Sequence, residues 1–200
     1  MFGTLPPEST RRALVIAPFA FAGIALFAMR KRLDPDEKAV ADSNEEVTII
    51  EFDDAGQRKG PAPVHKVVRS SGEWRKQLGA EQYYVTRREG TDTAFSGTYY
   101  QLHQAGLFRC ICCGNALFSS DTKFDSGTGW PSFWAPVAEE NIGTRSDFTL
   151  LIKRTEVHCI RCDAHLGHLF NDGPEPSYLR YCMNESSLKF VGLRSVPHAT

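Results

Sequence analysis

Residues 33–200 of this chain lack any block of basic residues. The whole chain holds 23 basic and 24 acidic residues. Residues 1–32 contain five of the basic ones and one of the acidic ones, which leaves 18 basic and 23 acidic residues for the remainder. A protein that binds nucleic acid usually presents a cationic surface to the phosphates. The sequence therefore predicts no nucleic-acid partner.

Internal repeats and low-complexity segments are also missing, and only one apolar run is long. Residues 13–29 carry no charge, and basic residues flank them on both sides. This run of 17 residues lies at the lower limit for spanning a bilayer, which needs about 17 to 25. We predict that residues 1–32 form a membrane anchor or an export signal, and that residues 33–46 form an acidic linker.

The residues that flank the apolar run do not decide whether it is a cleaved export signal or an uncleaved anchor. Residues 10–15 resemble a twin-arginine export signal, and the small residues at 39–41 offer a cleavage site. An uncleaved run would instead anchor the protein in the membrane. We expect an exported or membrane-anchored protein with its domain on the extracytoplasmic side. The alternative is the cytoplasmic face of the membrane.

The rest of the chain predicts one mainly β domain at residues 47–194. Residues 47–52 read as a strand closed by a turn at 53–56, and Pro61 and Pro63 keep the following chain extended. A first helix is expected directly after Ser70, with Glu73 in its first turn, and a second at residues 81–87. Short, glycine- and aromatic-rich strands follow from residue 95. We therefore expect antiparallel β-sheets with helices confined to the N-terminal part.

Four of the six cysteines fall in two C-x-x-C pairs, Cys110 with Cys113 and Cys159 with Cys162. Four thiolates in tetrahedral geometry form a typical structural zinc site. The sequence predicts one structural zinc ion per chain, which clamps two hairpins together. The alternative is a pair of redox disulfides, which an exported protein would permit.

Cys182 lies apart from these pairs, in the strand predicted at residues 179–184. Alternate side chains of a strand share a face, so Arg180, Cys182 and Asn184 should lie together. A cationic neighbour favours the thiolate, which is the nucleophilic form of cysteine. Cys182 is thus a candidate nucleophile; the alternative is a buried structural cysteine.

Several sequence motifs resemble those of the B-type methionine sulfoxide reductases. The resemblance covers about residues 72 to 192. The motifs are FDSGTGWPSF at 124–133, RTEV at 154–157, HLGHLF at 165–170, DGP at 172–174 and RYCMN at 180–184. The family reduces the R epimer of methionine sulfoxide to methionine, and thereby repairs oxidised proteins.

The resemblance implies a role for each matched residue. Cys182 would be the nucleophile that becomes a sulfenic acid. His165 and His168 would protonate the sulfoxide oxygen, directly or through an ordered water. The remaining implied residues assist them: Asp172 and Arg180 orient and charge the site, Asn184 binds the oxygen or a histidine, and Trp130 and Phe133 bind the substrate.

The resemblance also implies the partners. The substrates would be proteins or peptides that carry methionine sulfoxide, and the free amino acid as well. A thioredoxin-like protein or a small thiol would regenerate the enzyme. In many family members a second cysteine stands at the position of Thr128, where it would attack the sulfenic acid. Threonine cannot do this, and the spare Cys112 is a candidate replacement.

Two rival functions remain open at this point. One is a zinc-ribbon binding module without catalysis. Such a module would not explain why Arg180, Cys182 and Asn184 share one face of a strand. The other is a thiol peroxidase that uses Cys182 to reduce peroxide. Thiol alkylation separates the first rival from the reductase, and substrate competition separates the second.

Overall fold

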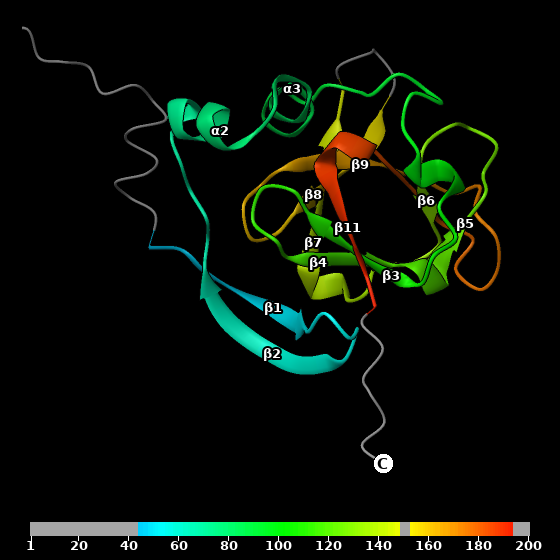
Figure 1. The fold of residues 1–200 in the computed structure, drawn as a ribbon, viewed down its shortest axis with the longest axis horizontal. Coiled ribbons are helices and arrows are strands. Elements are labelled where there is room, and N and C mark those ends of the chain that lie inside the picture. The colour runs from blue at the N-terminus through cyan, green and yellow to red at the C-terminus, as the bar shows by residue number, and fades with distance from the viewer. Residues whose placement is uncertain (1–43, 149–152, 194–200) are drawn as a thin grey trace, which may run out of the picture. The chain divides into compact units, whose positions relative to one another are not determined.

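Antiparallel β-sheets dominate the computed structural model, which describes residues 44–148 and 153–193 (Figure 1). The largest sheet has six strands in the order β5-β6-β10-β9-β8-β7. Its strands are β5 (Lys123–Phe124), β6 (Ser132–Phe133), β7 (Ile142–Asp147), β8 (Arg154–Cys159), β9 (His165–Phe170) and β10 (Arg180–Met183). A second sheet has the order β11-β3-β4, with β3 at Gly106–Cys110, β4 at Ala116–Ser119 and β11 at Leu188–Gly192.

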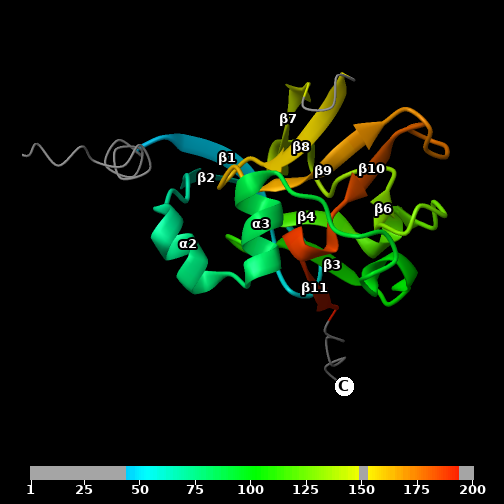
Figure 2. The same cartoon turned by 90° about the horizontal axis from the view of Figure 1, so that it is seen from above.

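Two short helices precede the two larger sheets in the chain and lie side by side, as both views show (Figures 1 and 2). In α2 (Ser71–Gln77) the Ser70 side chain accepts from the Glu73 amide, and the Glu73 carboxylate accepts from the Ser70 amide. This capping box satisfies two amides that the first helical turn leaves unpaired. Helix α3 (Ala80–Arg88) follows directly, with Gly79 as its N-cap. Both helices lie where the sequence predicts them.

An N-terminal hairpin of β1 (Glu46–Phe52) and β2 (Arg58–His65) forms a separate two-stranded sheet. The Asp53 carboxylate accepts from the amides of Ala55 and Gln57, which closes the predicted turn. The Asn141 carboxamide then ties β1 to the domain, because it accepts from the Ile50 amide and donates to the Ile50 carbonyl. The prolines of β2 lack an amide hydrogen, so this edge strand resists pairing with another chain.

The hydrophobic core lies between the two larger sheets and under α2. Phe118 stacks on Phe133 with ring centroids 4.5 Å apart, and Phe108 meets Phe133 edge-on at 4.9 Å. Trp74 of α2 is 2 % exposed and belongs to the same cluster. Burial of such aromatic side chains contributes most of the stabilisation in a domain of this size.

The fold class is as the sequence predicts, mainly β with helices in the N-terminal part. Among residues 44–148 and 153–193, none of the helices has the length and apolar character that crossing a membrane would require. The apolar run at residues 13–29 lies outside the described residues, and so does most of the predicted linker.

Candidate functional site

Cys182 opens into a pocket of about 140 Å³ between the central strands of the large sheet. Strand β10 places Cys182 opposite His168 of β9 on one side and opposite Ser132 of β6 on the other. The pocket is lined by residues from five segments: Thr91, Trp130, Arg154, Gly167, His168, Phe170, Cys182 and Asn184. The structure thus brings four predicted site residues into one cavity.

Burial and the neighbouring polar groups have opposite effects on the pKa of the Cys182 thiol. Burial raises its pKa, while the Arg180 guanidinium and the hydroxyls of Thr128 and Ser132 lower it. Burial is the largest of these effects, and the pKa of Cys182 lies above its ordinary value. The expected cationic neighbour is therefore present, but its effect on the pKa does not outweigh that of burial. Cys182 rests as a thiol at neutral pH.

Arg180 is held by Asp172 through two parallel hydrogen bonds. Its Nε and Nη2 donate to the two carboxylate oxygens at 2.8 and 2.9 Å. This pairing lowers the pKa of Asp172. The guanidinium also lies over the Phe170 ring, 4.3 Å from its centroid. Neither Asp172 nor Arg180 lines the pocket, but the Arg180 guanidinium lies beside the Cys182 thiol.

Trp130 and Asn184 are joined through the backbone of Asp92. The Trp130 indole donates to the Asp92 carbonyl at 3.1 Å, and the Asp92 amide donates to the Asn184 side-chain oxygen at 2.9 Å. The Asn184 side-chain nitrogen in turn donates to the Leu166 carbonyl at 3.1 Å. Both polar atoms of Asn184 thus have backbone partners, which leaves one N–H of the carboxamide for a ligand.

His168 faces the pocket as part of an Arg–carboxylate–His set. Its Nε2 lies 2.9 Å from Oδ2 of Asp147, and Nη2 of Arg154 donates to the same oxygen at 2.6 Å. Burial lowers the pKa of His168, and the hydrogen bond with Asp147 opposes this effect. Asp147 and Arg154 were not predicted as site residues. Arg154 begins the RTEV motif, but no pattern in the sequence marks Asp147.

His165 belongs to a second Arg–carboxylate–His set and does not line the pocket. Its Nδ1 lies 2.7 Å from Oε1 of Glu156, to which Nη2 of Arg145 also donates, at 3.0 Å. Although burial raises the pKa of Glu156, these two hydrogen bonds hold it below its ordinary value. His165 is 2 % exposed, and its Nε2 has no hydrogen-bond partner among the described residues.

The two histidines are nevertheless neighbours. Their rings meet edge-on with centroids 5.4 Å apart. His165 therefore touches the histidine that lines the pocket, while its own ring is enclosed.

Phe133 is one predicted substrate-binding residue that the structure places elsewhere. Its side chain is 0 % exposed and packs in the core between Phe108 and Phe118. A ring without exposed surface cannot touch a substrate, so the expectation for Phe133 was wrong. The strand alternation explains the difference, because neighbouring residues of β6 point to opposite faces and Ser132 faces Cys182.

The two Cys pairs converge as the spacing predicts. The sulfurs of Cys110, Cys113, Cys159 and Cys162 all lie within 4.8 Å of one another. The Cys110–Cys162 and Cys113–Cys159 sulfur pairs are each 3.6 Å apart. Sulfurs at about 2.3 Å from a tetrahedral zinc ion would be about 3.8 Å apart. All four cysteines are free thiols in the structure, and the spacing of their sulfurs fits a metal ion.

Cys112 lies beside this cluster and not beside Cys182. It is 4 % exposed, and its thiol has Cys110, Cys162, Thr86 and Arg87 as its polar neighbours. Thr128, by contrast, lies next to Cys182. Its hydroxyl is 2.8 Å from Ser126 Oγ, which is 2.8 Å from Ser132 Oγ. A chain of hydroxyls therefore occupies the place where the family's second cysteine would stand.

Known proteins are similar in sequence to the part of the chain that forms this site. The SelR domain model matches residues 78–192, more than half of the chain. A peptide methionine sulfoxide reductase MsrB of Hahella chejuensis is 54% identical over 125 residues, which cover 62% of this chain and 90% of that protein. The MsrB of Pseudomonas aeruginosa is 50% identical over 126 residues, 63% of this chain and 96% of that protein.

A plant relative extends the comparison. The chloroplastic peptide methionine sulfoxide reductase B1 of Oryza sativa is 48% identical over 128 residues, which cover 64% of this chain and 59% of that protein. The family match begins at Leu78, directly after α2, and ends with β11, so it includes Cys182, its pocket and the four-cysteine cluster. The chain belongs to the B-type methionine sulfoxide reductase family.

Proposed function

We propose that this protein reduces the R epimer of methionine sulfoxide to methionine, in proteins, in peptides and as the free amino acid. The observation that carries the proposal is the pocket in which Cys182 faces Trp130, His168 and Asn184. A single accessible thiol beside a protonatable ring and an apolar wall is what sulfoxide reduction requires. The protein would thereby repair oxidised proteins.

The chemical step transfers one oxygen atom. The Cys182 thiolate attacks the electrophilic sulfoxide sulfur and forms a sulfur–sulfur bond while a proton is delivered to the oxygen. The hydroxyl group is then transferred to the Cys182 sulfur, which breaks both the sulfur–oxygen bond and the new sulfur–sulfur bond. The substrate leaves as a thioether that has gained two electrons. Cys182 loses those two electrons and holds the oxygen as a sulfenic acid.

The proton would come from His168. Asp147 accepts from one ring nitrogen, which stabilises the imidazolium and fixes the ring. The other nitrogen, Nδ1, would then donate to the sulfoxide oxygen, directly or through an ordered water. Arg154 holds the Asp147 carboxylate in place through the 2.6 Å hydrogen bond. His165, with Glu156, would support His168 through the contact between the two rings.

Substrate orientation would depend on Trp130 and Arg180. The indole offers a flat apolar wall to the substrate methyl group, with a sulfur–aromatic attraction of about 0.3 to 1.5 kcal/mol. Arg180, held by Asp172, would stabilise the Cys182 thiolate as it forms. The free N–H of Asn184 would donate to the sulfoxide oxygen.

An external thiol would regenerate Cys182. Because Thr128 stands beside Cys182 where a second cysteine would stand, the sulfenic acid has no adjacent thiol. A small thiol would enter the pocket and form a mixed disulfide, and a second thiol would release Cys182. A thioredoxin-like protein would act more slowly, because it attacks disulfides.

We further propose that the four-cysteine cluster holds one structural zinc ion. Zinc would be held by Cys110, Cys113, Cys159 and Cys162, and it would join the turn after β3 to the turn after β8. It supplies no redox chemistry, so its role is to hold the fold. For residues 1–32 we propose an export signal or anchor that places the domain on the extracytoplasmic side.

The test is an assay of the purified protein on the separate R and S epimers of a methionine sulfoxide peptide, with dithiothreitol as reductant. We expect reduction of the R epimer and no reduction of the S epimer. Reduction of hydrogen peroxide in preference to the R epimer would contradict the proposal and favour the thiol peroxidase.

A further inference from the structure

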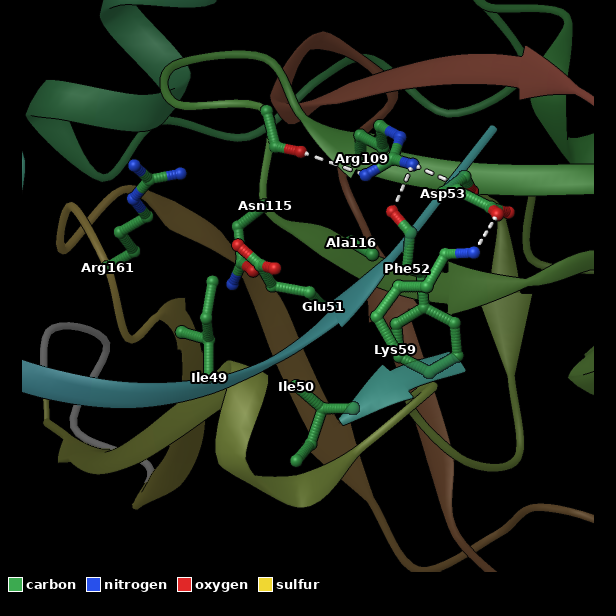
Figure 3. A pocket seen from close by; sticks show the side chains of 11 residues that line it. Ile49, Ile50, Glu51, Phe52, Asp53, Lys59, Arg109, Asn115, Ala116 and Arg161 are labelled. Carbon is green, nitrogen blue, oxygen red and sulfur yellow. Dashed lines mark hydrogen bonds and ion pairs between the residues drawn. The ribbon is translucent and has the colours of Figure 1, made fainter. Parts of the chain in front are cut away.

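A cavity of about 300 Å³ beside the N-terminal hairpin is separate from the Cys182 pocket (Figure 3). In it Lys59 pairs with Asp53 at 2.6 Å, and Arg109 donates to the Phe52 carbonyl at 2.9 Å, so these side chains fix the hairpin turn against β3. Among the described residues, the two cavities share no lining residue. The polar groups at the hairpin therefore serve the fold, and those that act on Cys182 come from other segments.

The loop between β5 and β6 brings three hydroxyl groups together beside Cys182. Ser126 Oγ lies 2.8 Å from Thr128 Oγ1 and 2.8 Å from Ser132 Oγ. Ser132 of β6 is the partner of Cys182 in the antiparallel pairing with β10, so the two side chains share a face of the sheet. Thr128 and Ser132 both place their hydroxyls beside the Cys182 sulfur. Ser126 thus bridges the two hydroxyls that flank the sulfur.

Two glycines and one carboxylate fix the shape of this loop. Gly127 and Gly129 have φ angles of +69° and +85°, which glycine adopts without the steric cost of a side chain. The Asp125 carboxylate accepts from the Gly127 amide at 2.9 Å. The loop conformation therefore holds the hydroxyls of Ser126 and Thr128 against the start of β6.

Charged and titratable groups face Cys182 from the other strands. His168 of β9 and Arg154 of β8 line its pocket, and Arg180 of β10 lies beside its thiol. The loop and β6 contribute hydroxyls instead, which are neutral and can donate to a thiolate. The hydroxyls of Thr128, Ser126 and Ser132, here called the hydroxyl chain, thus form the polar surroundings of Cys182 on the β6 side.

With Cys182 as a thiol, every hydrogen of the hydroxyl chain has an acceptor. Each hydroxyl has one O–H and can also accept. The Cys182 S–H can donate to Thr128, Thr128 to Ser126, and Ser126 in turn to Ser132. The Ser132 O–H donates to the Trp130 carbonyl at 3.2 Å. That distance is long for an O–H···O bond, so this last hydrogen is weakly held.

Loss of the thiol proton then requires only one hydroxyl to turn. A thiolate accepts hydrogen bonds and donates none, and bonds to a charged acceptor are stronger than bonds to a carbonyl. The Ser132 O–H therefore gains by turning from the Trp130 carbonyl to the sulfur. Thr128 still donates to Ser126, and Ser126 still donates to Ser132. Each donation polarises the next hydroxyl, which strengthens the final bond to the sulfur.

We propose that Ser126 is a positioning residue for the Cys182 nucleophile. Its hydroxyl holds Ser132 in place and donates to it, so that the Ser132 O–H turns to the sulfur when the thiolate forms. This inference rests on the proposed function for the role of Cys182, and it adds a residue that does not line the pocket. The hydroxyl chain would thus add to the effect of Arg180 on a thiolate that burial disfavours.

The test is the pH dependence of Cys182 alkylation by iodoacetamide in the full-length protein as purified, with mass mapping of the Cys182 peptide. We expect Ser126→Ala to raise the alkylation midpoint by about half a pH unit, which lowers the rate at neutral pH about three-fold. Ser132→Ala removes the donor itself and should lower that rate about ten-fold. Ser126→Thr keeps the hydroxyl and should behave as the wild type. The matched control is Ser120→Ala, a half-buried serine that accepts from the Gly106 amide at 3.0 Å outside the pocket, which should also behave as the wild type.

A double substitution distinguishes positioning from a general loss of stability. If Ser126 acts through Ser132, then Ser126→Ala should change nothing further in a protein that already carries Ser132→Ala. An unchanged alkylation midpoint in Ser126→Ala would overturn the inference. It would also be overturned by an effect of equal size with and without the Ser132 hydroxyl, or by the same rise of the midpoint in Ser126→Thr.

The inference and the proposed function can fail separately. In Ser126→Ala the rate of R-epimer reduction in a single turnover should fall about three-fold, as alkylation does. Alkylation does not require reductase activity. A raised midpoint in Ser126→Ala of a protein that leaves the R epimer unreduced would support the inference and contradict the proposed function alone.

Discussion

The four-cysteine cluster and the Cys182 pocket use the same side chain in opposite ways. In the cluster, four sulfurs within 4.8 Å of one another come from two tight turns. Among the described residues, the cluster contains cysteines alone, without a carboxylate or an arginine. A metal ion is therefore the natural partner of the four thiolates. In the pocket, one thiol lies beside Arg180 and two hydroxyls and opens to a cavity. The number and kind of neighbours, and not the cysteine itself, separate a structural thiol from a reactive one.

Removal of one cluster cysteine should have the largest effect. In Cys110→Ser the metal would lose a ligand in a site whose binding free energy is largely folding free energy. We expect loss of the metal and unfolding of most of the domain, because a domain of this size is stable by only about 5 to 15 kcal/mol. Metal analysis and circular dichroism measure this.

The matched control for this variant is Cys112→Ser, which changes a buried cysteine beside the cluster but outside the set of four. It should keep its metal and its fold. Wild-type protein that is folded and contains no metal would contradict the structural zinc site.

Removal of Cys182 should abolish activity and leave the fold unchanged. A serine hydroxyl has a pKa far above 7 and cannot replace the thiolate. We expect Cys182→Ser to lose more than 99 % of R-epimer reduction, a loss of at least about 10²-fold, while its metal content and melting temperature stay at the wild-type values. Retention of more than a few per cent of the activity would show that another residue is the nucleophile.

The pH dependence should identify the acid that works with Cys182. The reactive state has Cys182 as a thiolate and His168 as an imidazolium. In that state the two groups together carry one titratable proton. Burial raises the pKa of Cys182 above its ordinary value and lowers that of His168 below its own. The ordinary values are about 8.5 and 6.5. The rate should therefore be constant between the two pKa values, fall below the lower one, and fall above the higher one.

In His168→Ala the rate should fall by about 10²- to 10⁴-fold at neutral pH. Only the thiolate is then required, so the remaining rate should rise with pH up to the pKa of Cys182. His103→Ala, which changes an exposed histidine outside the pocket, should behave as the wild type. A flat profile in His168→Ala would contradict the role of this histidine as the acid.

A new thiol beside Cys182 should have a smaller effect. Thr128→Cys would place a second cysteine within reach of the sulfenic acid and allow an internal disulfide. We expect thioredoxin-supported turnover to rise by several-fold, about the scale of 1 kcal/mol, with little change in turnover on dithiothreitol. Steady-state rates with each reductant measure this. Equal thioredoxin-supported rates in the two proteins would mean that the resolving step is not limited by the missing thiol.

The sequence predicts those structural features that depend on local residue patterns. The two Cys-x-x-Cys spacings predict the cluster, and the Ser70–Glu73 capping box predicts the start of α2. The Asp147–His168 contact cannot be foreseen in this way, because it joins β7 to β9 across an intervening strand. The Phe133 expectation failed because a motif does not show which face of a strand each residue occupies. The raised pKa of Cys182 cannot be foreseen for a similar reason, since the sequence reveals a cationic neighbour but not the depth of burial.

The measurement that tests the account most directly is a single turnover on the R epimer without reductant, followed by trapping of sulfenic acids and peptide mapping of all six cysteines. We predict that the trapped group is found on Cys182 alone and that Cys110, Cys112, Cys113, Cys159 and Cys162 remain unmodified. A loss of two hydrogens with Cys112 joined to Cys182 would contradict the separation of the reactive thiol from the cluster, and would make Cys112 the resolving residue.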